Sequence, residues 1–237
     1  MRPKHVARNP IITLDFDGCI ALGEQAKIKY AKVYHNIDLN SNQIVKKTYP
    51  LGPEKYKELM DKVTTIHIME YILDPKCKQV LKDLYNEGFR FAVVTSRSGE
   101  ELKAAIKFSK FNKLPISYFH GTDNKPKTLI CRKLKSRAMI DDSLHKLAKL
   151  VNTPLHLYFL KRKWNSHEIV SRRSEVIQIK GWREFQIKLL EMRELHEAIC
   201  YYNNWRNNFA RVKQISDFLK NNKPKALKML KDYRKEK

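Results

Sequence analysis

The sequence has few cysteines, no long apolar run and about half as many acidic as basic residues. Its cysteines lie far apart and form no CxxC pair, which argues against a zinc site or a disulfide framework; they are Cys19, Cys77, Cys131 and Cys200. No apolar run approaches the roughly 18 residues that a membrane span needs. The basic N-terminus lacks the apolar core of a signal peptide. We therefore expect a cytoplasmic protein with reduced thiols and no membrane partner.

The shortage of acidic residues leaves a formal net charge of +23, with 48 Lys+Arg against 25 Asp+Glu. Such a charge attracts polyanions, including phosphates and nucleic acid. The basic excess is spread over the first 180 residues and the remainder alike, so it is not a basic tail on a neutral protein. A solvated surface and a nucleic-acid-binding surface both explain this charge, and composition does not separate them.

Two carboxylates, Asp15 and Asp17, directly follow the apolar run at residues 11–14. The β-branched and apolar residues of this run are typical of a buried parallel strand. A strand that ends in acids delivers charge to the carboxyl edge of a sheet, where open α/β sheets bind their ligands. Gly18 then permits a tight turn. The alternative is an ordinary strand whose following acids cap the next helix.

Two further apolar runs also end in polar residues. Residues 91–94 are followed by Thr95 and Ser96, and the short apolar run within residues 137–143 ends in Asp141 and Asp142. Helical patterns precede both runs, and this alternation indicates parallel strands joined by crossover helices. Because parallel strands place their carboxyl ends on one side, we expect these polar side chains to meet Asp15 and Asp17 in one crevice.

This combination resembles the haloacid dehalogenase (HAD)-like hydrolases. The marks of that superfamily are a DxD strand end, a Thr or Ser strand end, a lysine and a final pair of acids. They correspond here to Asp15-Phe16-Asp17, Thr95, Lys127 and Asp141-Asp142, with Lys125 as a competing assignment for the lysine. The resemblance implies a Rossmann-like α/β fold with a parallel sheet flanked by helices.

The segment after the second acid pair is similar to the 5′(3′)-deoxyribonucleotidase-like branch of the superfamily. In that branch a strand is followed by a Trp-Asn or Tyr-Asn turn and later by a tryptophan that opens a helix. Trp164-Asn165 and Trp182 match this pattern. Cys19 departs from the family, which usually has Thr or Val there, and we expect it to pack without taking part in the chemistry.

The resemblance implies a Mg²⁺-dependent phosphohydrolase with an aspartyl-phosphate intermediate. Asp15 would be the nucleophile, and Asp17 would protonate the leaving group and then activate water. Thr95, Ser96 and Lys127 would hold the phosphate. The expected ligands of Mg²⁺, a cation that prefers hard oxygen donors, are Asp15, Asp17 through its backbone carbonyl, and the pair Asp141-Asp142. We expect Asp142 to bind the metal directly and Asp141 to act through water.

The chain divides into three predicted parts. Residues 1–19 and 75–180 form the catalytic core, 20–74 a helical cap inserted after the first strand, and 181–237 a helical, basic C-terminal extension. Strands are expected at 11–14, 91–94, 116–119, 137–140 and 155–160. Helices are expected at 24–35, 41–47, 53–72, 75–88, 98–112, 127–135, 143–151 and from 181 onward, with a break at Pro224.

Two functions follow from this organisation. The first is a phosphatase of small phosphomonoesters, with nucleoside 5′-monophosphates as the preferred class, because in the resembled family an insertion at this place closes over the active site and would exclude polymers. Aromatic or basic cap residues could contact the base; the candidates are Tyr30, Tyr34, His35, Tyr49, Tyr56, Lys57 and His67. The second is a nucleic-acid-binding protein or end-processing phosphatase, with a basic groove formed by Lys103, Lys107, Lys110, Arg132 and Lys133.

Overall fold

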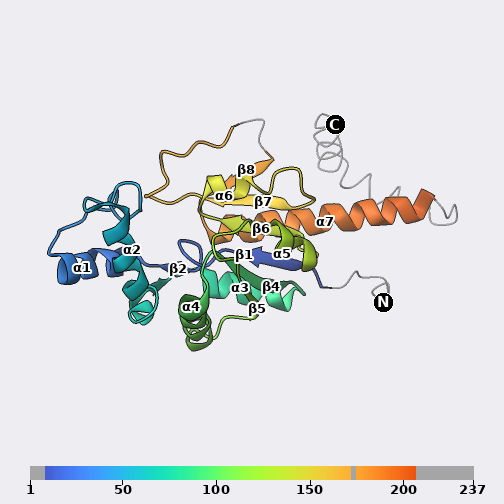
Figure 1. The fold of residues 1–237 in the computed structure, drawn as a ribbon. Helices are drawn as coiled ribbons and strands as arrows, with labels where there is room; N and C mark the ends of the chain where they lie inside the picture. The colour runs from blue at the N-terminus through green and yellow to red at the C-terminus, as the bar shows by residue number, and fades with distance from the viewer. Residues whose placement is uncertain (1–8, 172–174, 207–237) are drawn as a thin grey trace. The chain divides into compact units, whose positions relative to one another are not determined.

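The protein is built on a six-stranded parallel sheet in the order β5-β4-β1-β6-β7-β8. The structure is a computed structural model and describes residues 9–171 and 175–206. The strands are β1 (Ile11–Leu14), β4 (Arg90–Thr95), β5 (Ile116–Gly121), β6 (Ala138–Asp141), β7 (His156–Leu160) and β8 (Val176–Ile179). The predicted α/β fold, a parallel sheet flanked by helices, is confirmed (Figure 1).

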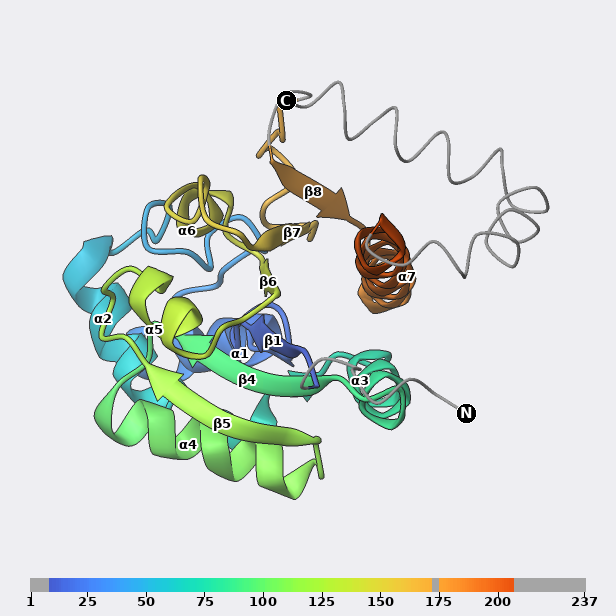
Figure 2. The ribbon, with the colours of Figure 1, turned by 90° about the vertical axis from the view of Figure 1, so that its right-hand side faces the viewer.

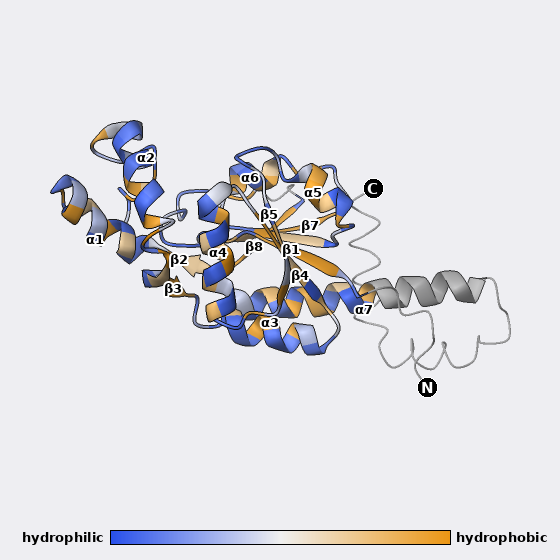
Figure 3. Ribbon diagram, turned by 60° about the horizontal axis from the view of Figure 1, so that its bottom comes forward, coloured by the Kyte–Doolittle hydropathy of each residue, from blue (hydrophilic) through white to orange (hydrophobic). Residues whose placement is uncertain are grey.

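The central strands are apolar because the sheet is covered on both faces. Ile12 and Leu14 of β1 are fully buried, as are residues 91–94 of β4. Thr13 lies between them, and its hydroxyl donates a hydrogen bond to the carbonyl of Ala138 at 2.9 Å. In Figure 3 the strands are the most apolar part of the fold. Burial on both faces explains why these strands are continuous apolar runs instead of alternating patterns.

The core helices cover the two faces of the sheet in pairs. They are α3 (Cys77–Asn86), α4 (Gly99–Phe111), α5 (Thr128–Lys133) and α6 (Leu144–Ala148). Figure 2 shows α3 and α4 on one face and α5 and α6 on the other. This arrangement follows from right-handed crossovers, because the chain moves outward from β1 to β5 and then returns to the other side of β1. All carboxyl ends of the strands therefore open to the same edge.

A small lobe is inserted between β1 and α3, and we call residues 20–74 the cap. It contains β2 (Ala21–Leu22), α1 (Glu24–His35), α2 (Gly52–Val63), the 3₁₀ helix η1 (Ile68–Glu70) and β3 (Ile72–Leu73). Strands β2 and β3 pair antiparallel, so the two connections between cap and core run side by side. In Figure 1, α1 and α2 project away from the sheet.

Two helix predictions in the cap were wrong: one helix does not form, and the other is shorter than predicted. No helix forms at residues 41–47, where Asn40 and Gln43 side chains accept hydrogen bonds from nearby backbone amides. Such local bonds compete with helix formation. Helix α2 ends at Val63 instead of residue 72, and the hydroxyls of Thr64 and Thr65 bond back to the carbonyls four residues earlier. Two consecutive β-branched residues that bond to the preceding turn weaken its continuation.

The sixth strand, β8, was not predicted. It pairs in parallel with β7, and its end residues Val176 and Ile179 are buried whereas the two residues between them are exposed. A four-residue edge strand with this pattern has neither the apolar run of a central strand nor strict alternation.

A helix beginning at Gly181 was predicted, and α7 (Trp182–Arg206) begins one residue later. The side chain of Glu184 accepts a hydrogen bond from the backbone N–H of Lys180 at 2.8 Å, which ties the residue before the N-cap to the first turn of the helix. The chain separates into two compact units, residues 1–186 and 187–237, and α7 passes from the first to the second. The predicted helices after residue 206 and the break at Pro224 lie outside the described residues. Among the described helices, none is long and apolar enough to cross a membrane.

Candidate active site

The carboxyl ends of β1 and β6 bring three carboxylates together. One carboxylate oxygen from each of Asp15, Asp141 and Asp142 lies within 4.8 Å of the other two. The chain positions them through the sheet itself, because the backbone N–H of Asp15 continues the β1–β6 ladder by donating to the carbonyl of Ile140 at 2.9 Å. Asp15 and Asp141 are almost completely buried. We call these three residues the acid cluster.

A buried lysine bridges two members of the acid cluster. The Nζ atom of Lys127 lies 2.6 Å from Oδ1 of Asp15 and 2.8 Å from Oδ2 of Asp141. Burial alone would lower the pKa of this lysine, but the charges of Asp141 and Asp15 outweigh burial and raise its pKa. Lys125, the competing assignment, is exposed. The structure therefore places Lys127, not Lys125, in the crevice.

Lys127 does not fully compensate the negative charge of the acid cluster. Burial, together with the neighbouring carboxylates, raises the pKa of Asp141 and raises that of Asp142 to about 7. The Oδ2 atom of Asp15 is buried and accepts no hydrogen bond from the described residues. Three converging carboxylates are the donor set of a hard divalent cation. The residues present therefore fit a metal ion at this position.

A second lysine near the cluster was missed by sequence reasoning. The Nζ atom of Lys146, on α6, lies 3.7 Å from Oδ2 of Asp15. The charge of Asp15 is the main reason that the pKa of Lys146 is raised. The sequence could have indicated this lysine, because α6 begins just after the acid pair and Lys146 lies about one helical turn beyond Asp142. Lys146 could therefore contact an anion held at the cluster.

Asp17 is not part of the acid cluster but forms a paired contact with Arg97. Nε and Nη2 of Arg97 each donate to one carboxylate oxygen of Asp17 at 2.8 Å. Burial would raise the pKa of Asp17, but the guanidinium outweighs it and lowers that pKa. The remaining Nη1 of Arg97 donates to the carbonyls of Thr64 in the cap, at 2.8 Å, and Glu101 in α4, at 3.2 Å. Arg97 thus links the second carboxylate of the DxD motif to the cap.

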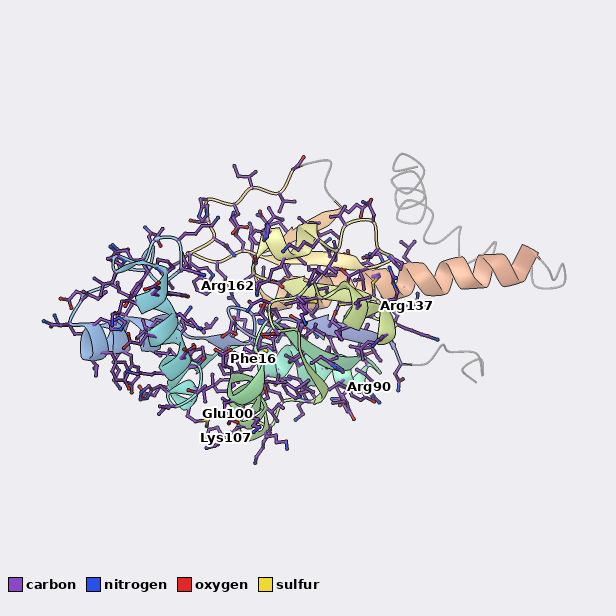
Figure 4. The ribbon with its side chains drawn as sticks, in the orientation of Figure 1. Phe16, Arg90, Glu100, Lys107, Arg137 and Arg162 are labelled. Atoms are coloured by element: carbon purple, nitrogen blue, oxygen red, sulfur yellow. The ribbon has the colours of Figure 1, made fainter. Side chains whose placement is uncertain are left out.

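Arg97 makes these contacts from a buried position. The residue is only 3% exposed, and its guanidinium lies over the ring of Phe16 at 4.9 Å, a residue labelled in Figure 4. Sequence reasoning did not select Arg97, although it lies two residues after Thr95 at the same strand end. A positively charged residue so close to a strand end that faces the predicted crevice could have been selected as a partner for its carboxylates.

Thr95 and Ser96, the predicted phosphate-binding pair, lie at the end of β4. Thr95 is almost completely buried, and Ser96 is partly buried. Their carbonyls accept hydrogen bonds from the amides of Thr122, at 2.8 Å, and Asn124, at 3.2 Å. The segment after β5 is therefore fixed against this turn. Their predicted role in binding phosphate stays a prediction.

The connections to the cap are held by the turn after β7. Arg162 donates to the carbonyls of Gly18, at 2.9 Å, and Cys19, at 3.2 Å, and its Nη2 also pairs with the carboxylate of Asp74 at 2.7 Å. These contacts place Arg162 at the junction of cap and core (Figure 4). Trp182 donates to the carbonyl of Cys19 at 3.1 Å. The thiol of Cys19 is buried, and burial raises its pKa.

The aromatic cap residues proposed for base stacking mostly contact one another. The rings of Tyr30 and His67 stack with their centroids 3.6 Å apart, and the rings of Tyr49 and Tyr56 meet edge to face with their centroids 5.5 Å apart. His35 hydrogen bonds to Tyr49 at 2.6 Å. These contacts stabilise the cap itself. Stacking on a substrate stays a prediction for each of these residues.

Part of the predicted basic groove lines a hollow between the cap and α4. The hollow has a volume of about 420 Å³ and is lined by Thr65, Ile66, Glu100, Lys103, Ala104 and Lys107. Lys103 forms an ion pair with Glu100 at 2.6 Å, which reduces the positive charge there. None of the acid cluster lines this hollow. Glu100 and Lys107 are labelled in Figure 4.

Comparison with known proteins points to one family. The family model described as haloacid dehalogenase-like hydrolase matches residues 18–143, a span that includes Lys127, Asp141 and Asp142 and begins just after Asp17. No curated protein matches the chain.

Solved structures share the fold at low sequence identity. One described as a predicted phosphatase from Clostridium acetobutylicum is 16% identical with a TM-score of 0.57, covering 78% of this chain and all of that one. CbbY from Rhodobacter sphaeroides in complex with phosphate is 15% identical with a TM-score of 0.52, covering 73% and 95%. A dehalogenase is 14% identical with a TM-score of 0.51, covering 76% and 96%. At these identities the likeness concerns the fold.

Proposed function

Because the chain belongs to the haloacid dehalogenase-like hydrolases, whose family model matches just over half of it, we propose that it is a Mg²⁺-dependent phosphomonoesterase. The observation that carries this proposal is the acid cluster, in which Lys127 bridges Asp15 and Asp141 while Oδ2 of Asp15 accepts no hydrogen bond from the described residues. One oxygen of Asp15 is thereby fixed and the other is available to attack.

In this proposal the phosphoryl group passes through Asp15. Oδ2 of Asp15 forms a bond to phosphorus as the ester P–O bond breaks, and the leaving oxygen takes a proton from Asp17. Water then attacks phosphorus, gives its proton to Asp17 and releases phosphate from Asp15. Lys127 and Lys146 offset the negative charge throughout. Bound Mg²⁺, held by the acid cluster and the backbone carbonyl of Asp17, would neutralise the charge between nucleophile and phosphate.

The Asp17–Arg97 contact constrains this cycle. A carboxylate whose two oxygens both accept from a guanidinium carries no proton. As described, Asp17 can accept a proton from water but cannot give one to a leaving group. The first step therefore requires the pair to separate, and a shift of Thr64 in the cap would remove one of the bonds that hold Arg97. We propose that cap movement and leaving-group protonation are coupled in this way.

A small substrate is the proposal that the cap favours, with nucleoside 5′-monophosphates as the preferred class. The Trp164-Asn165 turn supports this class through the resemblance to deoxyribonucleotidases. The alternative, a phosphatase acting on nucleic-acid ends, is supported by the net charge of +23 and by the hollow lined by Lys103 and Lys107.

The decisive experiment is a phosphate-release screen with Mg²⁺ over nucleotides, sugar phosphates and oligonucleotides phosphorylated at either end. Wild type should release phosphate from a small phosphomonoester, and Asp15→Asn should not. Asp38→Asn is the matched control, since it makes the same change at an exposed cap position. Release by Asp15→Asn at the wild-type rate, or no release by wild type from any substrate, would contradict the proposal.

Competition at different salt concentrations separates the two substrate classes. Affinity for single strands falls with salt with a log–log slope of about −0.7 per neutralised phosphate. A mononucleotide phosphatase should lose oligonucleotide competition near physiological salt. Competition that persists there, and disappears when Lys103 and Lys107 are replaced by Ala, would favour the alternative.

A further inference from the structure

The turn after β7 contacts the acid cluster through one tryptophan. The indole Nε1 of Trp164 donates a hydrogen bond to Oδ2 of Asp142 at 2.9 Å. An indole N–H can only donate, so this contact requires Asp142 to present a lone pair. The other oxygen, Oδ1, accepts no hydrogen bond from the described residues and is left for another partner.

Asn165 fixes the position of that tryptophan. Its Nδ2 donates to the carbonyl of Asp142 at 2.7 Å and to that of Leu160 at 3.0 Å, and its Oδ1 accepts from the backbone N–H of Arg162 at 2.7 Å. Asn165 is only 2% exposed. A buried amide that uses both its oxygen and its nitrogen is a rigid anchor. The turn is thus tied directly to the backbone of the residue whose side chain Trp164 contacts.

The carboxylate of Asp142 is also confined by Gly18. A Cβ atom added to Gly18 would lie 2.0 Å from Oδ2 of Asp142, so only glycine leaves room for this carboxylate. Gly18 has a φ of +76°, a conformation that other residues rarely adopt. Between Gly18 and Trp164 the side chain of Asp142 has little freedom to turn away from Asp15 and Asp141.

We infer that Trp164 is a positioning residue for the metal site, holding Oδ2 of Asp142 so that the carboxylate points into the acid cluster. This inference rests on the proposed function, because it assigns a role toward the proposed Mg²⁺. Hydrogen bonds to ligating carboxylates orient them, and losing such a partner typically costs about 10–100-fold in metal affinity. Trp164→Phe keeps the aromatic ring and removes the donor.

The test measures Mg²⁺ binding to the full chain without substrate. Isothermal titration should give Trp164→Phe an affinity about 10–100-fold weaker than that of wild type. Trp182→Phe is the matched control. It also removes a buried indole hydrogen bond, at 3.1 Å to the carbonyl of Cys19, but it touches no carboxylate of the cluster. Its Mg²⁺ affinity should stay within a few-fold of wild type.

Tryptophan fluorescence provides a second readout that does not depend on the folding of Trp164→Phe. The variant Trp182→Phe/Trp205→Phe retains Trp164 as its only tryptophan. Its emission should change with added Mg²⁺ and saturate over the same concentrations as the calorimetric binding. Asp142→Asn in that background should remove the change.

The outcomes separate this inference from the proposed function. Equal Mg²⁺ affinity in wild type and Trp164→Phe, or emission unaffected by bound Mg²⁺ in the single-tryptophan variant, would overturn the inference and leave the phosphatase proposal standing. Wild type that neither binds Mg²⁺ nor releases phosphate would overturn both. Weakened binding in Trp164→Phe with normal binding in Trp182→Phe would support both.

Discussion

Replacing Lys127 with methionine tests the electrostatics of the crevice directly. Methionine fills a similar volume but leaves Asp15 and Asp141 facing each other without the cation that lies 2.6 and 2.8 Å from them. Removing one partner of a buried ion pair costs about 3–5 kcal/mol, because the remaining charges stay buried without compensation. For a unit of this size that free energy corresponds to a fall in melting temperature of about 6–20 °C.

Thermal unfolding in a chelator at pH 8 is the assay, with Lys125→Met as the matched control. Lys125 is exposed, so its substitution should change stability by less than about 0.5 kcal/mol. The pKa of Lys127 is raised above 10.5, so its stabilising contribution is present below that pH and is lost only as pH rises beyond it. In Lys127→Met the deficit should shrink toward pH 5 as an unpaired carboxylate takes up a proton, and at pH 8 Mg²⁺ should partly restore the melting temperature. Equal melting temperatures for the two variants would refute this account of the crevice.

Three further predictions concern the neighbouring residues. Arg97→Lys cannot reproduce the paired bonds that keep Asp17 ionised, so Asp17 should take up a proton more readily, and kcat/KM for an alkyl phosphate should rise by up to about 100-fold relative to that for an aryl phosphate, whose leaving group needs no proton; an unchanged ratio would contradict a link to leaving-group protonation. Gly18→Ala should weaken Mg²⁺ binding in calorimetry at least about 10-fold by displacing Asp142, whereas Gly52→Ala, with a similar φ of +80° and nothing within 4 Å, should not. Because the pKa of Asp142 is raised from 3.8 to about 7, folding disfavours its ionised form, and the metal-free protein should lose stability as pH rises between those values. Mg²⁺ affinity should fall as pH drops below 7, because the protonated carboxyl is a poorer ligand. An Mg²⁺ affinity independent of pH from 6 to 8 would contradict the raised pKa of Asp142.

The sequence was sufficient to predict the sheet because its central strands are buried on both faces. Residues 11–14 and 91–94 appear as short runs of apolar and β-branched residues, and the acids that follow β1 and end β6 mark the edge of the sheet. The edge strand β8 and the end of α2 were not predictable in the same way. They depend on pairing with β7 and on hydroxyls of Thr64 and Thr65 that bond to their own helix.

The candidate site shows a similar division. The DxD motif and the acid pair were visible as local patterns, and the structure brings Asp15, Asp141 and Asp142 together. Arg97 was marked only by its place two residues after Thr95, and its pairing with Asp17, 80 residues away in the sequence, depends on the adjacency of β1 and β4. The sequence pattern selected Lys127, which contacts the cluster, but Lys146 was not selected among the many lysines.

The most direct test of the central claim is to trap the phosphorylated enzyme. Wild type is mixed with Mg²⁺ and an accepted phosphomonoester, quenched in acid, digested and analysed by mass spectrometry for a phosphoryl group on the peptide that contains Asp15. The account predicts that this peptide gains one phosphoryl group, assigned to Asp15 by fragmentation, and that Asp15→Asn gains none. Phosphate release by wild type without any phosphorylated Asp15, or a phosphoryl group on another residue, would contradict Asp15 as the nucleophile.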